Sequence, residues 1–493
     1  MGIIEKQATK NLIYSYLGAG LGFVTLMWSS HLLSPDENGL TRILLSITAL
    51  FSQFASLGFN AVTSRFFPYF RNKEKGHHGY LYYGIITTLA GFTLCYITFY
   101  FFKDQIIADN QQKSKLFADY LFYLMPLTFF TLFFGLFDYY LRACYRSVIG
   151  SSSKDLTQRI LILAVLFLYF LKIINFNIFV FLYVAATCIP TLILLYYIVK
   201  LGEWHVKPVR GFVSKELRKE MINLSLYAII IGSSGILMSS IDVIMVNQKL
   251  GLKQTGIYGI AFYFGSIIII PSRSLLRIAM GIVADAFKKN DLEEISRLYK
   301  KSCNSQLTIG LLLFIGIWCN INNIMALLPP EYAGGKNVIL FISLGNLIDM
   351  GTGFNYIIMM TSKHYRFDGI FMIIILFLTI FLNYLLIPIY GITGSAIATA
   401  TTIAAYNIMR WLFLLFKFKM QPYDLNNVKI IVIAAIAFLP GYFMPYLNFL
   451  VIDIAVRSGI VGGLFILLLL KTEAAPEINI KIRKNLKRFS IHI

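Results

Sequence analysis

The chain has 493 residues, of which 57% are hydrophobic and only 14% are charged, and its mean hydropathy is +0.70. A soluble globular chain is about 25% charged, so this composition excludes an ordinary soluble protein and indicates that lipid surrounds most of the chain. The formal net charge of +20 is spread through the sequence rather than concentrated in one basic domain, which argues against nucleic acid as a partner.

Long apolar stretches recur along the whole chain. A helix needs about 20 mainly apolar residues to cross the hydrocarbon layer. We predict an all-α polytopic membrane protein with about fourteen spans, near residues 11–33, 40–64, 79–102, 118–141, 160–178, 180–200, 221–246, 256–284, 305–327, 337–360, 369–389, 392–416, 430–447 and 450–470. The weakest division lies between Lys172 and Asn177, so thirteen spans is the alternative.

Basic residues gather in alternate loops. The loops assigned to the cytoplasm begin with Lys6, Lys10, Arg71, Lys73, Lys75, Arg146 and Lys154, continue through the basic segment 200–220, and end with the tail from Lys481 onward. The opposite side is poor in basic residues, and its first turn is Pro35 to Gly39. Cytoplasmic loops of membrane proteins carry this excess of Lys and Arg, so we predict that both termini are cytoplasmic.

Two parts of the chain share a spacing that suggests internal duplication. Gly39 opens the second span and Arg71 closes it, while Gly256 opens the eighth span and Lys288 closes it at the same separation. Chance is the alternative explanation. Repeated bundles around a central site are a common transporter plan. We therefore predict two pseudo-symmetric six-helix bundles and two added helices, divided as 1–200, a basic cytoplasmic linker 201–220, 221–417, 418–470 and a basic tail 471–493.

Short motifs in several spans resemble those of one transporter family. They are Met1-Gly2-Ile3-Ile4 with Tyr16-Leu17-Gly18, Arg65-Phe66-Phe67-Pro68, the run from Ile241 to Val246 with Gly256-Ile257-Tyr258, and the run from Pro388 to Thr399. In their order and spacing the chain resembles the polysaccharide-biosynthesis flippases of the multidrug/oligosaccharidyl-lipid/polysaccharide exporter superfamily. The resemblance implies fourteen helices in two bundles, a central cavity, and transport of an undecaprenyl-diphosphate-linked glycan across a bacterial inner membrane toward the periplasm.

Arginines within the spans are candidates for contact with such a substrate. Arg273 and Arg277 share one helix face just after Pro271, which can kink the helix, and a guanidinium binds phosphate oxygens in a bidentate way. The alternative is that both reach the lipid headgroups. Arg65 lies in the corresponding place of the first bundle, where the headgroup role is favoured. Arg42, one turn into its span, is a candidate on the release side.

An acidic side chain within a membrane span costs insertion free energy, so its presence indicates a function or a specific partner. Asp138 and Arg142 are four residues apart, which favours an intrahelical ion pair, although the pair could still line a cavity. Asp242 and Asp349 each have two interpretations: a site for H⁺ or Na⁺ that couples transport to an ion gradient, or a hydrogen bond between helices.

The sequence favours a carrier over an enzyme. The loops assigned outside are too short to hold a catalytic domain, the six histidines lie in loops, helix ends or the tail, and there is no GxxxxGK[ST] motif for nucleotide phosphates. We expect neither a cofactor nor a metal. The favoured function is an O-antigen type flippase of lipopolysaccharide assembly that works by alternating access among membrane lipids and other glycan-assembly proteins. The alternatives are an ion-coupled multidrug or toxin exporter, a flippase for a peptidoglycan lipid precursor and, less favoured, a membrane glycan polymerase or ligase.

Overall fold

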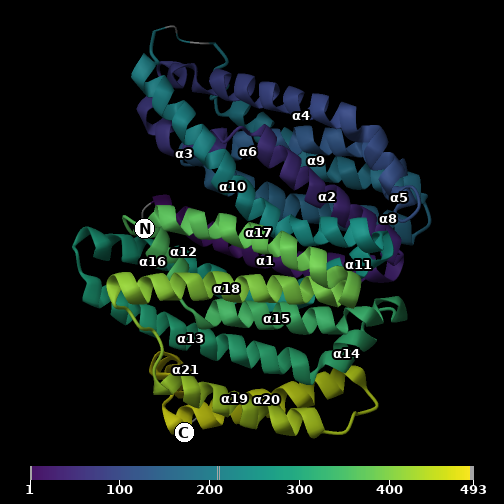
Figure 1. Ribbon diagram of the computed structural model, residues 1–493, viewed down its shortest axis with the longest axis vertical. Helices are drawn as coiled ribbons and strands as arrows, with labels where there is room; N and C mark the ends of the chain where they lie inside the picture. Colours follow the sequence, from purple (N-terminus) through teal and green to yellow (C-terminus); the bar gives the residue numbers. More distant parts are fainter. Residues whose placement is uncertain (1–2, 208, 210, 489–493) are drawn as a thin grey trace. The chain divides into compact units, whose positions relative to one another are not determined.

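The computed structural model describes residues 3–207, 209 and 211–488, with no account of the side chains of residues 3–12, 231, 239, 273, 274, 277, 278 and 485–488. Within these ranges the chain consists of helices joined by turns and contains no strand (Figure 1). The predicted all-α fold class is confirmed.

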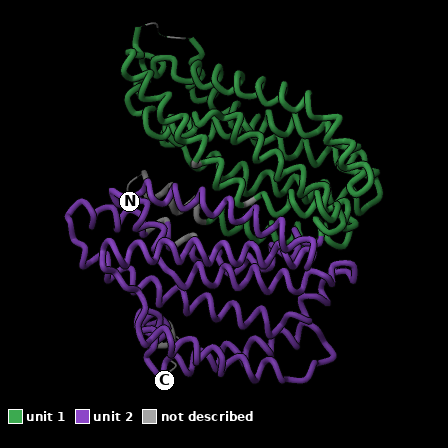
Figure 2. The backbone as a smooth tube through the Cα atoms, viewed as in Figure 1, with its two compact units in different colours: residues 1–256 green, residues 257–493 purple. Residues whose placement is uncertain are grey.

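The contacts divide the chain into two compact units, residues 1–256 and 257–493 (Figure 2). The sequence placed the boundary between bundles earlier, in the linker 201–220. The difference arises from α10 (Lys215–Leu250), which packs against α2 (Pro35–Ala55) and α3 (Phe59–Phe70) and therefore groups with unit 1. The division into two six-helix bundles concerns an internal repeat, and it stays a prediction.

Unit 1 is a bundle of helices around two apolar cores. Besides α2, α3 and α10 it contains α1 (Ile3–Leu32), α4 (Tyr80–Asn110), α5 (Lys115–Asp119), α6 (Leu124–Ala143), α7 (Ser147–Ser152), α8 (Gln158–Phe170), α9 (Phe176–Lys200) and the start of α11 (Leu252–Ser266). A capping box starts α2, because the Ser34 N–H donates to Glu37 Oε2 (2.8 Å) and the Glu37 N–H donates to Ser34 Oγ (3.3 Å). This cap makes the second helix begin five residues before its apolar run.

The second predicted span is bent rather than straight. α2 and α3 meet at an angle of 47°, and Leu57 (φ 47°) and Gly58 (φ 71°) at the break are left-handed. A Cβ atom at Gly58 would collide with the backbone of Ser225 in α10, so this position needs glycine for space as well as for conformation.

Unit 2 is a second bundle. It contains α12 (Ile270–Lys288), α13 (Leu292–Cys319), α14 (Ile321–Ala326), α15 (Lys336–Gly351), α16 (Asn355–Thr361), α17 (Tyr365–Tyr390), α18 (Ile392–Phe418), α19 (Leu425–Phe443), α20 (Leu450–Thr472) and α21 (Pro476–Arg488). The expected disturbance at Pro271 is confirmed, since a 3₁₀ turn, Ile267–Ile269, separates α11 from α12. Gly353 (φ 64°) marks a second break, where α15 and α16 meet at 56°.

Nine helices among the described residues are long and apolar enough to cross a membrane, or up to eleven if each bent pair is one span. The chain is therefore a multi-pass membrane protein. The other three predicted spans coincide with α1, α8 and α18, and the count of fourteen stays a prediction. The predicted fifth span, 160–178, is displaced: helical structure starts at α7, continues through a π-helical turn, Ser153–Thr157, and ends with α8 at Phe170.

Candidate functional site

A cavity of about 250 Å³ lies within unit 1. Its lining comes from α2, α6, α9, the π-helical turn and the first residue of α8. The lining residues are Leu45, Thr48, Ala49, Thr131, Phe134, Lys154, Gln158, Thr187 and Pro190. Thr48, Thr131 and Thr187 lie near the middle of their helices, so the cavity lies about halfway along the bundle. It combines an ammonium, an amide and three hydroxyls with apolar walls.

Lys154 supplies the positive charge of this cavity. The sequence placed it in a cytoplasmic loop, but Lys154 lies in the π-helical turn that runs directly into α8, so it is not in a loop, and its cytoplasmic side stays a prediction. Its Nζ is 5.1 Å from the ring centroid of Phe134, a cation–π distance. π-Helical turns are frequent at functional sites, and a cation within the membrane costs about 2.5–3.5 kcal/mol on insertion scales. Both features indicate a functional role.

Thr48 contributes a buried hydroxyl group to the cavity wall. Its side chain is 2% exposed, and its Oγ1 has no hydrogen-bond partner among the described residues. Buried hydroxyls are nearly always hydrogen-bonded, so an unpaired one at a cavity wall points to a ligand or water there.

The expected ion pair between Asp138 and Arg142 is present, with 2.7 Å between Asp138 Oδ2 and Arg142 Nη2. The other carboxylate oxygen, Oδ1, is buried and has no hydrogen-bond donor in the described part of the chain. Lys154 is among the charges that act on Asp138. A side chain at Gly150 would collide with Oδ1, so the glycine leaves space for it. The pair therefore has one oxygen neutralised by Arg142 and one buried oxygen beside Gly150.

A hydrogen-bonded cluster lies at the break between α15 and α16 in unit 2. Asp349 Oδ1 accepts from Asn407 Nδ2 (2.9 Å), and Asn407 Oδ1 accepts from Thr352 Oγ1 and Asn355 Nδ2 (both 2.8 Å). The hydrogen bond between helices, one of the two interpretations of Asp349, is thus present. An ion-coupling role for Asp349 stays a prediction.

A buried ion pair joins α17 to α18. Arg410 donates to Asp368 through Nε (2.7 Å) and Nη2 (3.2 Å), and both side chains are almost wholly buried. The guanidinium also lies 3.6 Å from the ring centroid of Tyr406. Sequence reasoning missed this pair, because its members are 42 residues apart and no local pattern connects them.

A second buried pair in unit 2, Asp453 and Arg457, could have been found from the sequence. The two residues are four apart in α20, and Arg457 Nε donates to Asp453 Oδ2 (3.1 Å). Arg457 also donates to the backbone carbonyls of Gly441 and Met444. These bonds tie α20 to the end of α19, which indicates a structural role.

The remaining candidates lie apart from the Lys154 cavity lining. Arg65 is exposed on α3, 5.7 Å from the ring centroid of Phe66. Arg42 of α2 is half-buried and interacts with Tyr183 of α9. Asp242 of α10 is 3% exposed. Arg273 and Arg277 belong to α12, but their side chains lie outside the described residues.

His77, Cys144 and Glu203 bring three metal-ligating atoms within 4.8 Å of one another in unit 1. The hydrogen bonds favour a structural cluster instead. His77 Nδ1 accepts from the Asn72 N–H (3.1 Å), so the ring proton is on Nε2, which lies 2.7 Å from Glu203 Oε2 and donates to it. Nε2 then has no lone pair for a metal.

Residues 6–283, more than half of the chain, match a protein family described as polysaccharide biosynthesis protein. This segment includes every residue that lines the Lys154 cavity. No curated protein matches the chain.

Several solved structures share the fold. The chain is similar to the lipid II flippase MurJ in an inward closed conformation, with a TM-score of 0.72 and 14% identity over 93% of this chain and 97% of that one. It is similar to an inward-facing multidrug resistance MATE family transporter of the MOP superfamily (TM-score 0.63, 13% identity, 84% and 98% covered). It is also similar to a MOP superfamily transporter from Pyrococcus furiosus (0.53, 14%, 84% and 96%).

Proposed function

Because the chain belongs to the polysaccharide biosynthesis protein family, we propose that it is a flippase for an undecaprenyl-diphosphate-linked oligosaccharide. It moves this lipid from the cytoplasmic to the periplasmic leaflet of a bacterial inner membrane by alternating access. The observation that carries the proposal is the polar, cationic cavity around Lys154, which lies entirely within the family-matched segment.

The chemistry of the cavity suits part of such a substrate. The substrate has an isoprenoid tail that stays in the bilayer, an anionic diphosphate and a sugar that hydrocarbon excludes. Lys154 offers a positive charge, while Thr48 and Gln158 offer hydrogen bonds to hydroxyl or phosphate oxygens. We assign the further diphosphate and glycan contacts to intramembrane arginines, namely Arg42, Arg65, Arg142, Arg273 and Arg277.

The energy for transport comes in this proposal from a gradient of H⁺ or Na⁺. Asp138, Asp242 and Asp349 are the coupling candidates. Asp138 is supported by its buried Oδ1, which has no donor among the described residues and could hold a proton. Partners would be the other membrane proteins that assemble the glycan, such as those of O-antigen and lipopolysaccharide synthesis.

A multidrug exporter is the second candidate, because MATE family transporters share the fold. The coverage favours the flippase: the MurJ structure matches 93% of this chain and the MATE structure 84%.

The test is complementation of a clean gene deletion. Surface polysaccharide and undecaprenyl-diphosphate-linked repeat units on the cytoplasmic side are measured together. We expect the deletion to abolish surface glycan and to cause lipid-linked units to accumulate. Wild type and Lys300→Met, a change at an exposed lysine of α13, should restore export, whereas Lys154→Met at normal protein levels should not.

Two outcomes would contradict the proposal. Unchanged glycan combined with sensitivity to cationic drugs would favour the exporter. Full restoration by Lys154→Met would remove the cavity from the transport path even if the protein is a flippase. Lys154→Arg, which keeps the charge, separates a need for the ammonium from a need for a cation.

A further inference from the structure

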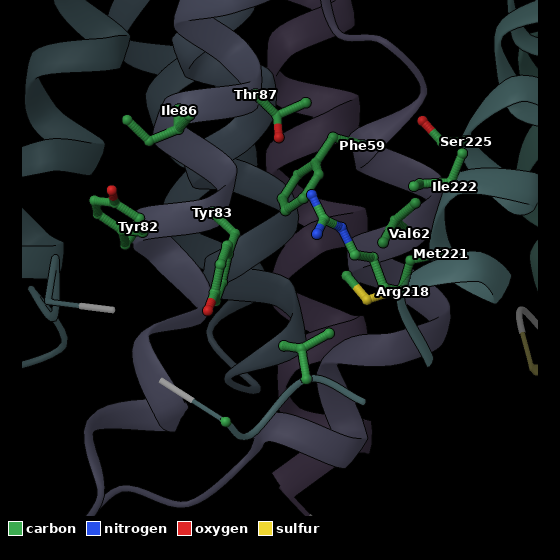
Figure 3. Close-up of a pocket in the computed structure, with 12 residues that line it drawn as sticks. Phe59, Val62, Tyr82, Tyr83, Ile86, Thr87, Arg218, Met221, Ile222 and Ser225 are labelled. Carbon is green, nitrogen blue, oxygen red and sulfur yellow. The ribbon is translucent and has the colours of Figure 1, made fainter. Parts of the chain in front are cut away.

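A second pocket, of about 500 Å³, lies between α3, α4 and α10 of unit 1 (Figure 3). The linker before α10 closes one side of it, and Phe212 of this linker stacks on His78 with 3.7 Å between ring centroids. The lining residues are Phe59, Val62, Tyr82, Tyr83, Ile86, Thr87, Gly211, Val213, Arg218, Met221, Ile222 and Ser225. The pocket shares no residue with the Lys154 cavity.

Arg218 is the charged residue among those that line this pocket. It lies in the first turn of α10, which Ser214 caps by accepting from the Leu217 N–H (3.1 Å). Figure 3 shows its guanidinium beside the ring of Phe59, directed into the pocket. No acidic side chain is present in the described lining, so the guanidinium is available to an anion from outside the protein.

The walls around Arg218 are apolar and partly open. Phe59 and Val62 form a buried floor, whereas Ile86 is 49% and Ile222 50% exposed. The 18-residue apolar window within Lys215–Met238 is only 12% buried, so this half of α10 leaves much apolar surface uncovered by the described residues. A ligand that fills the pocket must therefore combine an anionic head with a hydrocarbon chain.

We propose that this pocket binds one anionic phospholipid of the cytoplasmic leaflet. The phosphate accepts hydrogen bonds from Arg218, and an acyl chain lies along Val62, Ile86 and Ile222. One guanidinium matches the single charge of a phosphodiester, whereas a diphosphate calls for more cations. The basic segment 200–220 assigns this end of α10 to the cytoplasmic side. The inference is independent of the substrate that the protein transports.

The bound lipid would hold α10 against its neighbours. Ser225 donates to the Leu57 carbonyl at the break between α2 and α3, next to the pocket. A lipid between α4 and α10 would add packing to the contacts that α10 already makes with α2 and α3, and it would raise the thermal stability of unit 1.

The experiment uses the purified full chain, delipidated and then given phosphatidylglycerol, phosphatidylethanolamine or undecaprenyl phosphate. Bound lipid is counted by native mass spectrometry, and unfolding is followed by a thermal ramp. We expect one phosphatidylglycerol to bind and to stabilise the wild type, while phosphatidylethanolamine does neither. Arg218→Gln should weaken this binding roughly tenfold to a hundredfold, which is the loss of a charge-assisted hydrogen bond. Lys219→Gln, at an exposed neighbour outside the lining, should not.

Ile222→Trp, which fills the pocket and keeps Arg218, is a second variant and should also exclude the lipid. Equal phosphatidylglycerol binding by wild type, Arg218→Gln and Ile222→Trp would overturn the proposal. Preferential binding of undecaprenyl phosphate at Arg218 would reassign the pocket to the carrier lipid and overturn the choice of phospholipid.

Discussion

Among single residues, the buried ion pair of Asp368 and Arg410 leads to a specific prediction about the stability of unit 2. Removal of one partner leaves a buried charge without compensation, which costs about 3–5 kcal/mol. Asp368→Asn and Arg410→Met should therefore each destabilise unit 2 by about this amount, while the double variant Asp368→Leu/Arg410→Met should recover part of the loss. Cys303 and Cys319 are buried, so their reaction with a thiol-reactive dye reports unfolding during a thermal ramp.

The exposed pair Glu473 and Arg483 provides the control for this measurement. Glu473→Gln should change stability by less than about 1 kcal/mol, because surface ion pairs contribute little. A double variant that is as unstable as the sum of the single variants would show that Asp368 and Arg410 do not act as a pair.

The surroundings of His364 lead to a prediction of how the stability of the protein depends on pH. It lies in the turn between α16 and α17, and burial against Phe413 and Phe418 lowers its pKa, with a smaller contribution from Lys417 and Lys363. Because the pKa in the folded state is below that in the unfolded state, the unfolded chain binds the proton more tightly. Stability should therefore fall as the pH drops below the ordinary histidine value of 6.5.

The measurement for His364 is the unfolding temperature of wild type and His364→Leu between pH 8 and pH 5. The variant should lose this part of the pH dependence. An unchanged slope in the variant would assign the effect to other groups.

How far the sequence predicts single residues depends on whether their partners are local. The spacing of four residues that identified Asp138 and Arg142 applies equally to Asp453 and Arg457, whereas Arg410 meets Asp368 only through the packing of two helices. The helical state of Lys154 was not predicted, because Ser151, Ser152 and Ser153 before it are typical of a loop. A π-helical turn has no distinct signature in a single sequence.

At the element scale, two glycines from the predicted duplication pack against each other's helices. A Cβ atom at Gly39 would collide with the carbonyl oxygen of Leu252, and one at Gly256 would collide with that of Pro35. Leu252 lies four residues before Gly256, and Pro35 lies four residues before Gly39, so the contact between the two helices is reciprocal. Such a reciprocal contact also arises where any two helices cross closely at glycines, so the duplication stays a prediction.

Gly39→Ala and Gly256→Ala should each destabilise unit 1 by about 1–3 kcal/mol, the range for overpacking. The backbone carbonyl that each new methyl group would meet cannot move aside without shifting its helix. Thermal unfolding of the purified variants measures the effect. Gly316→Ala in α13 is the control, because no atom lies within 4 Å of its Cβ position, and it should be neutral or slightly stabilising. Stabilisation by Gly256→Ala would contradict the close crossing.

The sequence predicts the existence of elements better than their ends. An apolar run indicates each helix, but caps and breaks decide where the backbone turns. Ser34 extends the second helix backward through its cap, and Gly58 divides it. The bend at Gly58 depends on the space that Ser225 of α10 leaves, a long-range contact that residue spacing along one helix does not contain.

At the scale of the whole molecule, composition and the alternation of basic loops were enough to predict the fold class. The polar cavity was not predicted, because its walls come from four segments of the chain that are distant from one another in sequence. The boundary between units also depends on packing: α10 follows the basic linker, yet its contacts with α2 place it in unit 1.

The count of fourteen spans depends on α1, α8 and α18, and the last prediction tests α8 and α18. α8 by itself has only 13 residues, and Gln158 at its start lines the Lys154 cavity. α18 carries Asn407 and Arg410, whose hydrogen bonds and ion pair within the protein remove the cost of lipid exposure. If both helices span, Lys172 after α8 lies outside and Lys417 at the end of α18 lies inside. In a cysteine-free background, Lys172→Cys should react with an impermeant maleimide in intact spheroplasts, and Lys417→Cys only after permeabilisation. Lys73→Cys, in a side chain that is 71% exposed, controls for the cytoplasmic side. Protection of Lys172→Cys in intact spheroplasts and its labelling after permeabilisation would place both ends of α8 on the cytoplasmic side, and the chain would then have fewer than fourteen spans.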